Sequence, residues 1–256
     1  MFSQSLYRKY RPSNFNEVYG QTIAKKILIN SIDHAKISHA YLFFGPRGTG
    51  KTSIAKMFAR SVNCLAPVNG NCCEKCNNCL SSIDKNNVDI IEIDAASNNG
   101  VDEIRELRNK VNLVPNSLKY KVYIIDEVHM LSTGAFNALL KTLEEPPEHV
   151  IFILATTEIY KVPATIISRC QTIEFKNIDK KSMFERLSEI SKAENINITD
   201  DAINEIVQNS NGGLRDAIGL LEKSSDYADE DVIDVNEIRS LLGLVTKNEI
   251  EQLIKM

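Results

Sequence analysis

A phosphate-loop pattern constrains the fold of this chain more than any other feature of its sequence. Residues 45–52 read GPRGTGKT, which fits G-x-x-x-x-G-K-[ST], and they stand between a strand-like run, AYLFF, and a helix-like run, KTSIAKMFARSV. Glycines let backbone amides surround phosphate oxygens, and the following helix N-terminus adds partial positive charge. A purely structural glycine turn is the alternative, which the strand–loop–helix context disfavours. The residues expected to contact a nucleotide are Gly45, Pro46, Arg47, Gly48, Thr49, Gly50, Lys51, Thr52 and Ser53.

Within this loop, two side chains have distinct expected roles. Lys51 is expected to reach the β and γ phosphates, and the Thr52 hydroxyl is expected to hold Mg²⁺.

Strand-like apolar runs alternate with amphipathic helix-like runs through the first two thirds of the sequence. The predicted strands are residues 40–44, 88–94, 121–126, 149–157 and 171–175, and the predicted helices between them are 21–35, 51–62, 101–111 and 134–145. Near-continuous Val/Ile/Leu runs are typical of strands covered on both faces. The expected fold class is therefore α/β, with a parallel sheet flanked by helices.

After about residue 177 the strand pattern stops, and only helices are predicted, at residues 179–195, 199–210, 212–228 and 234–243. Asp179 and Thr199 are expected to cap the first two of these helices. The predicted organisation is an α/β domain over residues 1–178, a small all-α domain over 179–243, and the start of a further domain at 244–256. The last helix-like run leaves apolar residues uncovered, so we expect the complete protein to continue past residue 256.

Composition narrows the class of protein further. Hydrophobic residues make up 43% of the chain and charged residues 25%, which excludes disorder and collagen and is typical of a water-soluble globular protein. The longest apolar runs are far shorter than the roughly 20 residues of a membrane span, and no secretory signal is evident, so a cytoplasmic protein is expected. Residues 1–60 carry ten Lys/Arg against two Asp/Glu. Such polarity suits an anionic ligand or nucleic acid, although scattered solvated charges are an equal alternative.

An acidic pair follows the predicted strand KVYIID. Asp126 ends this strand and is expected to meet the metal ion, and Glu127 is expected to polarise the attacking water. An acidic pair after a strand, taken alone, more often caps a helix than forms a catalytic pair. The presence of the phosphate loop makes the catalytic interpretation the favoured one here. Two threonines, Thr156 and Thr157, end the next strand, and Thr157 is the preferred candidate for the hydroxyl that holds the same water or the γ phosphate. The alternative is that these hydroxyls only form hydrogen bonds with backbone groups at the strand end.

Two arginines have an open interpretation from the residues alone. Arg169, in ISRC, is either a surface ion pair or a finger that reaches the nucleotide of another subunit. Arg215, in GGLRDA, lies in the first turn of a helix, where a cation is disfavoured by the helix dipole, so it needs an anionic partner such as a γ phosphate.

Five cysteines lie within sixteen residues, which in a cytoplasmic chain favours metal binding over disulfides. CEKCNNC contains two overlapping C-x2-C pairs, and Cys64 supplies a fourth thiolate across a loop. The predicted site is a structural Zn²⁺ held by Cys64, Cys73, Cys76 and Cys79 within residues 64–79, with Cys72 either spare or competing with Cys73. An iron–sulfur cluster is the weaker alternative. Cys170 is interpreted as a buried apolar residue.

Taken in order, several segments resemble one protein family. They are YRKYRPSNFNEVYGQ, HAYLFFGPRGTGKTSIA, the cysteine insert, EIDAASNNGVDEIRE, IIDEVHMLS, FNALLKTLEEPPEHVIFILATT, ISRCQ and GGLRDA. This set is similar to the gamma/tau family of bacterial DNA polymerase III subunits, the AAA+ ATPases of sliding-clamp loaders. The resemblance covers essentially the whole chain, and the cysteine insert makes it specific.

This resemblance implies a zinc-bearing AAA+ domain, a helical lid, and a collar domain, starting at 244–256, that holds a pentamer together. It implies that Arg169 acts in trans on a neighbouring subunit, that Arg215 is the nucleotide sensor of the lid, and that Tyr7, Arg11, Pro12 and Val18 line the adenine pocket. Arg105, Lys141 and Lys161 would follow primer–template phosphates. Asn98 stands where the family commonly has Arg, which puts one DNA contact in doubt, and Cys72 is an addition to the usual spacing.

The function implied is that of an ATPase motor, which binds ATP or ADP with Mg²⁺ and opens and loads the beta clamp on primed DNA. It would work within the polymerase III holoenzyme without being the polymerising subunit. Expected partners are the delta and delta-prime subunits, further gamma/tau copies, the clamp and primer–template DNA, with polymerase and helicase contacted through the region past residue 256. The expected location is the bacterial cytoplasm, at the nucleoid. A non-hydrolysing scaffold is the alternative, and a branch-migration motor is disfavoured by the cysteine insert.

Overall fold

The computed structural model describes residues 4–84, 87–227 and 232–244, and the chain divides into two compact units. The α/β unit is Pro12–Lys176, and the helical unit combines Asn177–Met256 with Met1–Arg11.

Five parallel strands form the sheet of the α/β unit. They are β1 (Ala40–Phe44), β2 (Ile90–Asp94), β3 (Lys121–Asp126), β4 (Val150–Thr156) and β5 (Gln171–Glu174), in the spatial order β2-β3-β4-β1-β5. All seven residues of β4, the middle strand of this order, are buried. The predicted parallel sheet is therefore confirmed, and the near-continuous apolar runs correspond to strands covered on both faces.

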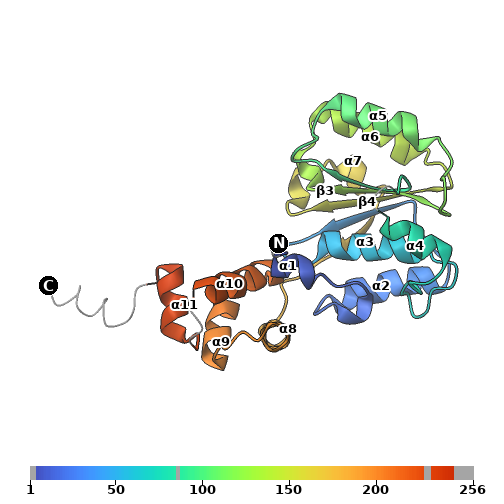
Figure 1. Cartoon of the computed structure of the whole chain (residues 1–256). Helices are drawn as coiled ribbons and strands as arrows, with labels where there is room; N and C mark the ends of the chain where they lie inside the picture. The colour runs from blue at the N-terminus through green and yellow to red at the C-terminus, as the bar shows by residue number, and fades with distance from the viewer. Residues whose placement is uncertain (1–3, 85–86, 228–231, 245–256) are drawn as a thin grey trace. The chain divides into compact units, whose positions relative to one another are not determined.

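Helices cover both faces of this sheet (Figure 1). On one face lie α2 (Thr22–Asp33) and α3 (Lys51–Val62), whose apolar residues pack with the sheet around Phe58, and Tyr41 meets the Phe58 ring edge to face. On the other face lie α5 (Val101–Val111), α6 (Thr133–Glu144) and α7 (Ala164–Ile167). Burying one such side chain stabilises the fold by about 1.5–3 kcal/mol. The apolar layers on the two faces therefore hold the strands, and with them the strand ends, in place.

Several short elements complete the α/β unit. They are η1 (Phe15–Glu17), α4 (Asn77–Ile83) in the cysteine-rich insert, η2 (Val128–Met130) after β3, and η3 (Ile159–Lys161) after β4.

The helical unit contains α8 (Lys180–Glu194), α9 (Asp200–Asn209), α10 (Leu214–Tyr227) and α11 (Val235–Leu242). Its core is apolar and includes the fully buried Leu187, Ile206 and Leu221. Asp179 accepts a hydrogen bond from the Ser182 amide, and Thr199 accepts one from the Ala202 amide. Both predicted N-caps are therefore confirmed, since each satisfies an amide that the first helical turn leaves free.

The amino-terminal segment is grouped differently from the sequence-based division, which put all of residues 1–178 in one domain. Helix α1 (Leu6–Lys9) belongs to the helical unit. The Leu6 amide donates to Glu222, 3.0 Å away, the Lys9 ammonium lies 2.6 Å from Glu194, and Arg186 donates to the Tyr10 carbonyl. These polar contacts hold the amino-terminal segment to the rest of the helical unit. The segment is too short to show a hydrophobic periodicity, so its sequence did not indicate which unit it joins.

Among the described residues, no helix is long and apolar enough to cross a membrane. The predicted start of a further domain at 244–256 lies, apart from Leu244, outside the described residues.

Candidate functional site

The site forms where three neighbouring strands end. Strand β4 lies between β3 and β1, and Phe44 of β1 is in register with Thr156 of β4. Because parallel strands present their carboxyl ends at one edge, the loop after β1, the acidic pair after β3 and the threonines after β4 meet there. The sheet order thus brings together motifs that lie more than 70 residues apart in the sequence.

The phosphate loop depends on glycine conformations. Gly45 has φ of 145°, and a Cβ built on it would lie 2.0 Å from the carbonyl oxygen of Phe175. No other residue type fits this close backbone approach without a shift of the chain. Farther along, the Thr49 hydroxyl donates to the Pro46 carbonyl, 2.8 Å away, and Gln21 donates to the Thr49 carbonyl, 3.2 Å away.

Lys51 is the first residue of α3 and is only 6% exposed. Its ammonium donates to the carbonyls of Gly45 and Pro46, both 2.8 Å away, so it lies inside the curve of the loop. Burial lowers the pKa of Lys51, and the negative charges of Glu127 and Asp126 oppose that shift. The arrangement places a cation where phosphate oxygens would lie in such a loop.

Thr52 and Asp126 face each other across the site. The Thr52 hydroxyl donates to a carboxylate oxygen of Asp126, 2.6 Å away. Mg²⁺ prefers oxygen ligands and is commonly held by one or two protein groups together with substrate phosphates. This pair of oxygens at the mouth of the loop fits such an ion.

Glu127 has a left-handed backbone, with φ of 47°, which is uncommon for a residue other than glycine. The Thr157 hydroxyl donates to its Oε2, 3.0 Å away, and the Thr157 amide lies 3.3 Å from the same oxygen. The structure therefore brings Thr157 to Glu127, whereas Thr156 is fully buried in β4. Backbone strain of this kind persists where the surrounding contacts determine the conformation, and it concentrates at functional sites.

Two residues of this cluster were not predicted from the sequence. His129 Nδ1 lies 3.0 Å from the Thr156 hydroxyl and 3.4 Å from Glu127 Oε2, and His129 Nε2 lies 3.2 Å from Glu158 Oε1. His129 stands two residues after Glu127 in the IIDEVH segment, and that proximity was the available signal. No sequence motif next to Glu158 indicates that it joins this cluster.

The two predicted arginines lie in different units. Arg169, in the α/β unit, donates to Glu144 Oε1 and to the Thr165 carbonyl at 2.8 and 2.7 Å. Arg215, in the helical unit, stacks over the Tyr7 ring with its guanidinium carbon 4.7 Å from the ring centroid.

The predicted adenine-pocket residues are also divided. Tyr7 and Arg11 belong to the helical unit, and Pro12 and Val18 belong to the α/β unit. This pocket stays a prediction, as do the roles of Arg169 and Arg215.

The candidate DNA-contacting cations are surface residues of the α/β unit. Arg105 pairs with Asp102, 3.0 Å away, and Lys161 pairs with Glu158, 2.8 Å away. Lys141 is exposed in the last turn of α6.

The four predicted zinc ligands lie together, because the sulfur atoms of Cys64, Cys73, Cys76 and Cys79 are all within 4.8 Å of one another. A tetrahedral Zn²⁺ with Zn–S bonds of about 2.3 Å needs sulfurs about 3.8 Å apart, so the set fits a metal of this kind. The amide of Leu65 lowers the pKa of Cys76 to about 6, whereas burial raises the pKa of Cys64 and of Cys79.

The other two cysteines differ from this set. Burial raises the pKa of the lone Cys170 to about 12, in keeping with an apolar, unreactive residue. Cys72 lies outside the four-sulfur cluster.

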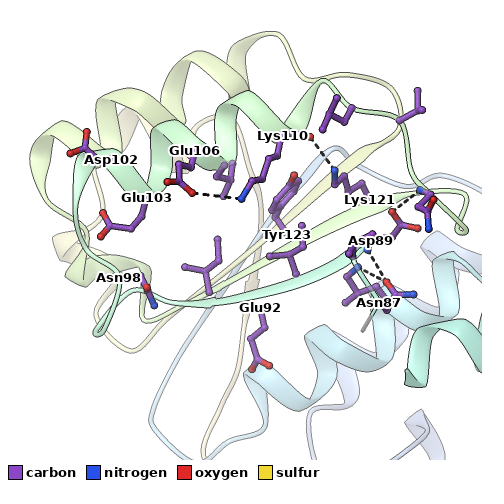
Figure 2. Close-up of a pocket in the computed structure, with 18 residues that line it drawn as sticks. Asn87, Asp89, Glu92, Asn98, Asp102, Glu103, Glu106, Lys110, Lys121 and Tyr123 are labelled. Atoms are coloured by element: carbon purple, nitrogen blue, oxygen red, sulfur yellow. Dashed lines mark hydrogen bonds and ion pairs between the residues drawn. The ribbon is translucent and has the colours of Figure 1, made fainter. Parts of the chain in front are cut away.

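A separate pocket of about 1000 Å³ lies at the outer edge of the sheet, between β2 and α5 (Figure 2). Asn98 and the acidic residues Asp102, Glu103 and Glu106 line it, and the phosphate-loop residues do not. The Tyr123 hydroxyl in its wall is buried and unpaired among the described residues. This pocket is thus distinct from the site at the strand ends.

A phosphate loop, an acidic strand end and a buried lysine at the carboxyl edge of a five-stranded parallel sheet define a P-loop nucleotide-binding protein of the AAA+ class. Comparison with known proteins agrees. A family model described as DNA polymerase III, delta subunit matches residues 20–179, and one described as RCF1/5-like, AAA+ ATPase lid domain matches residues 185–224. The tau and gamma relatives described next, 52% and 42% identical to this chain, show that it belongs to the gamma/tau family of DNA polymerase III subunits.

Two relatives illustrate the similarity. The chain is 52% identical to DNA polymerase III subunit tau of Bacillus subtilis over 100% of its own length and 45% of that relative. It is 42% identical to DNA polymerase III subunit gamma of Buchnera aphidicola subsp. Schizaphis graminum, over 95% of the chain and 67% of the relative. The chain thus spans about half the length of several curated relatives that it matches.

Among solved structures, the Holliday junction branch migration motor RuvB of Thermotoga maritima is similar, with a TM-score of 0.67 and 21% identity over 94% of this chain and 74% of that chain. At this identity the similarity shows the fold alone.

Proposed function

We propose that this chain is the nucleotide-binding part of the ATPase motor of a bacterial sliding-clamp loader. It would bind and hydrolyse ATP to open the beta clamp and load it on primed DNA, within the polymerase III holoenzyme and without polymerising DNA itself. The observation that carries this proposal is the convergence of Lys51, Thr52, Asp126, Glu127 and Thr157 at adjacent strand ends in a member of the gamma/tau family.

The reaction proposed is phosphoryl transfer from ATP to water. Loop amides and the Lys51 ammonium would bind the β and γ phosphates, with Thr52 and Asp126 holding Mg²⁺. When bound, the ion neutralises charge on the phosphates. Glu127 would accept a hydrogen bond from the attacking water, and Thr157 would hold Glu127 and the γ phosphate in position.

Three further roles are proposed from family membership. Arg169 would act on the nucleotide of a neighbouring subunit, where a guanidinium offsets charge developing during transfer. Arg215 would sense the nucleotide, and Tyr7, Arg11, Pro12 and Val18 would surround the adenine of ATP or ADP. Zn²⁺ on the four clustered cysteines would be structural, because four protein sulfurs leave no open ligand position.

The partners proposed are the delta and delta-prime subunits, further gamma/tau copies, the beta clamp and primer–template DNA, with Arg105, Lys141 and Lys161 as candidate phosphate contacts. Polymerase and helicase would be bound through sequence past residue 256. The place of action proposed is the bacterial cytoplasm, at the nucleoid.

The test is a Lys51→Ala variant, with Lys36→Ala, an exposed lysine of the same unit, as its control. In a loader reconstituted with its partner subunits, the Lys51→Ala chain should lose ATP binding, measured by fluorescence of a labelled nucleotide, and should lose ATP-dependent clamp loading. Clamp loading that survives this change would instead assign the chain to the scaffold class.

A further inference from the structure

His129 lies between two carboxylates next to the candidate hydrolytic site. Its side chain is only 6% exposed, its Nδ1 faces Thr156 and Glu127, and its Nε2 faces Glu158. Nothing assigned above requires a histidine there. In its neutral form the His129 imidazole carries hydrogen on one ring nitrogen only, so in that form the nitrogen that donates decides what Glu127 receives from it.

The Glu158 carboxylate divides its two oxygens between different partners. Its Oε2 accepts from the Lys161 ammonium, 2.8 Å away, and from the Tyr160 hydroxyl, and its Oε1 lies 3.2 Å from His129 Nε2. Hydrogen bonds from Lys161 and Tyr160 lower the pKa of Glu158. An ionised carboxylate only accepts, so the contact with Oε1 requires hydrogen on Nε2.

Thr156 accommodates the same tautomer. Its buried hydroxyl oxygen accepts from the Glu158 amide, 3.0 Å away. Its hydroxyl hydrogen is available to His129 Nδ1, 3.0 Å away, which the contact of Nε2 with Glu158 leaves as the acceptor. With Nδ1 as acceptor, no hydrogen bond joins it to Glu127 Oε2, and Thr157 is left as the donor to that oxygen.

We propose that Glu158 is a positioning residue for ATP hydrolysis, because it fixes His129 in the tautomer that does not donate to Glu127. The opposite tautomer would direct Nδ1–H at Glu127 Oε2 across 3.4 Å, which would occupy the oxygen and weaken it as an acceptor for water. This inference rests on the proposed function, in which Glu127 activates the water.

The arrangement makes a definite prediction for Glu158→Gln. Lys161 can only donate, so it should retain the amide oxygen of the new side chain. The amide nitrogen would then face His129 Nε2, which must become an acceptor, and the hydrogen should move to Nδ1. Adding Lys161→Met removes the donor that holds the amide oxygen of the new side chain. The amide can then rotate until its oxygen faces His129 Nε2, and the original tautomer should return.

Histidine ¹⁵N NMR spectra of the chain read the tautomer directly. Four histidines are present, and a His129→Gln spectrum assigns the signals of His129. The wild type and a Glu148→Gln control, which alters an exposed carboxylate of the same unit, should show Nε2–H, and Glu158→Gln should show Nδ1–H. Nδ1–H in the wild type, or an unchanged tautomer in Glu158→Gln, would overturn the inference whether or not the chain hydrolyses ATP.

Kinetics then test the consequence in the reconstituted loader. Glu158→Gln should lower kcat by about 10-fold or more while the KM for ATP stays unchanged, since a group that orients a reacting side chain acts on the chemical step. If Glu127→Gln is inactive and Glu158→Gln is fully active with a switched tautomer, the inference fails and the proposed function stands. If Glu127→Gln is fully active, the role of Glu127 in the proposed reaction fails and this inference fails with it, while the Lys51→Ala test of the proposed function stands apart.

Discussion

At the scale of single residues, the acidic pair after β3 divides into two environments. Asp126 bonds the Thr52 hydroxyl, whereas Glu127 turns away on a left-handed backbone and meets Thr157. Under the proposed function, Asp126 would hold the metal ion and Glu127 would activate water. Two acids that are adjacent in sequence meet different partners because the backbone conformation changes between them.

Replacing Glu127 with Gln should separate nucleotide binding from hydrolysis. The Lys51 ammonium donates to the Gly45 and Pro46 carbonyls, and Asp126 keeps its negative charge, so a labelled ATP analogue should bind as in the wild type. Loss of a general base typically lowers the rate by about 10² to 10⁴, and single-turnover hydrolysis in the assembled loader should show that loss. A Glu148→Gln chain is the control, and equal rates in both variants would contradict the assignment of Glu127.

The sequence was sufficient to predict Lys51, Thr52, Asp126, Glu127 and Thr157 as site candidates, because each lies in or next to a local pattern. His129, Glu158 and Gln21 were missed. The contacts of His129 with Thr156 and Glu158, and of Gln21 with Thr49, span roughly 30 residues, and they depend on strand register and on the course of the loops. A short sequence motif does not indicate contacts between residues that lie this far apart along the chain.

At the scale of elements, the turn from β1 into α3 is the most constrained part of the α/β unit. Gly45 approaches the Phe175 carbonyl and has positive φ, so both space and backbone conformation exclude a side chain. By contrast, a Cβ added at Gly219, inside α10, would meet nothing within 4 Å. Position 45 therefore requires glycine, whereas position 219 has room for a side chain.

Gly45→Ala should destabilise the chain by about 3 kcal/mol or more, from strain and overpacking together. Gly219→Ala should stabilise it by about 0.5–1 kcal/mol, because alanine is a better helix former and restricts the unfolded chain. Urea unfolding followed by circular dichroism measures both. A Gly45→Ala chain as stable as the wild type would show that the loop tolerates a side chain.

The cysteine insert is predicted to depend on its metal. The purified chain should contain about one Zn²⁺, and Cys76→Ser should lower both the metal content and the melting temperature, since one of four thiolates is lost. Cys170→Ser and Cys72→Ser are the matched controls and should retain zinc, measured by atomic absorption. Zinc loss in Cys72→Ser but not in Cys73→Ser would replace one predicted ligand with the other.

Element prediction succeeded where periodicity was long. The predicted helix at residues 51–62 coincides with α3, and that at 101–111 coincides with α5. Helices α1 and α4 were missed, since four and seven residues give too few turns for a period to appear. The strand order also had to come from the structure, because the sequence gives only the order along the chain.

At the scale of the whole molecule, the proposed function gives Arg169 a role on the nucleotide of another subunit. Within its own unit, Arg169 forms an ion pair with Glu144 at 2.8 Å and donates to the Thr165 carbonyl. Family membership favours a role for Arg169 on the nucleotide of an adjacent subunit. Sequence spacing could suggest this role but could not place the residue, because its proposed target belongs to another chain.

In mixed assemblies, Arg169→Ala should impair the neighbour's site and not its own. The variant alone should bind a labelled ATP analogue normally, whereas loaders built with it should hydrolyse ATP more slowly by about 10³-fold or more. Adding wild-type chains in increasing proportion should restore hydrolysis in steps. Rapid turnover by a verified monomer of the wild type would contradict action in trans.

Gln21 has a consequence that reaches past the site itself. Its amide nitrogen donates to the Thr49 carbonyl and to the Lys176 carbonyl, 2.7 Å away, and its amide oxygen accepts from the Lys176 amide. Lys176 is the last residue of the α/β unit, so one side chain holds both the phosphate loop and the point where the chain leaves this unit.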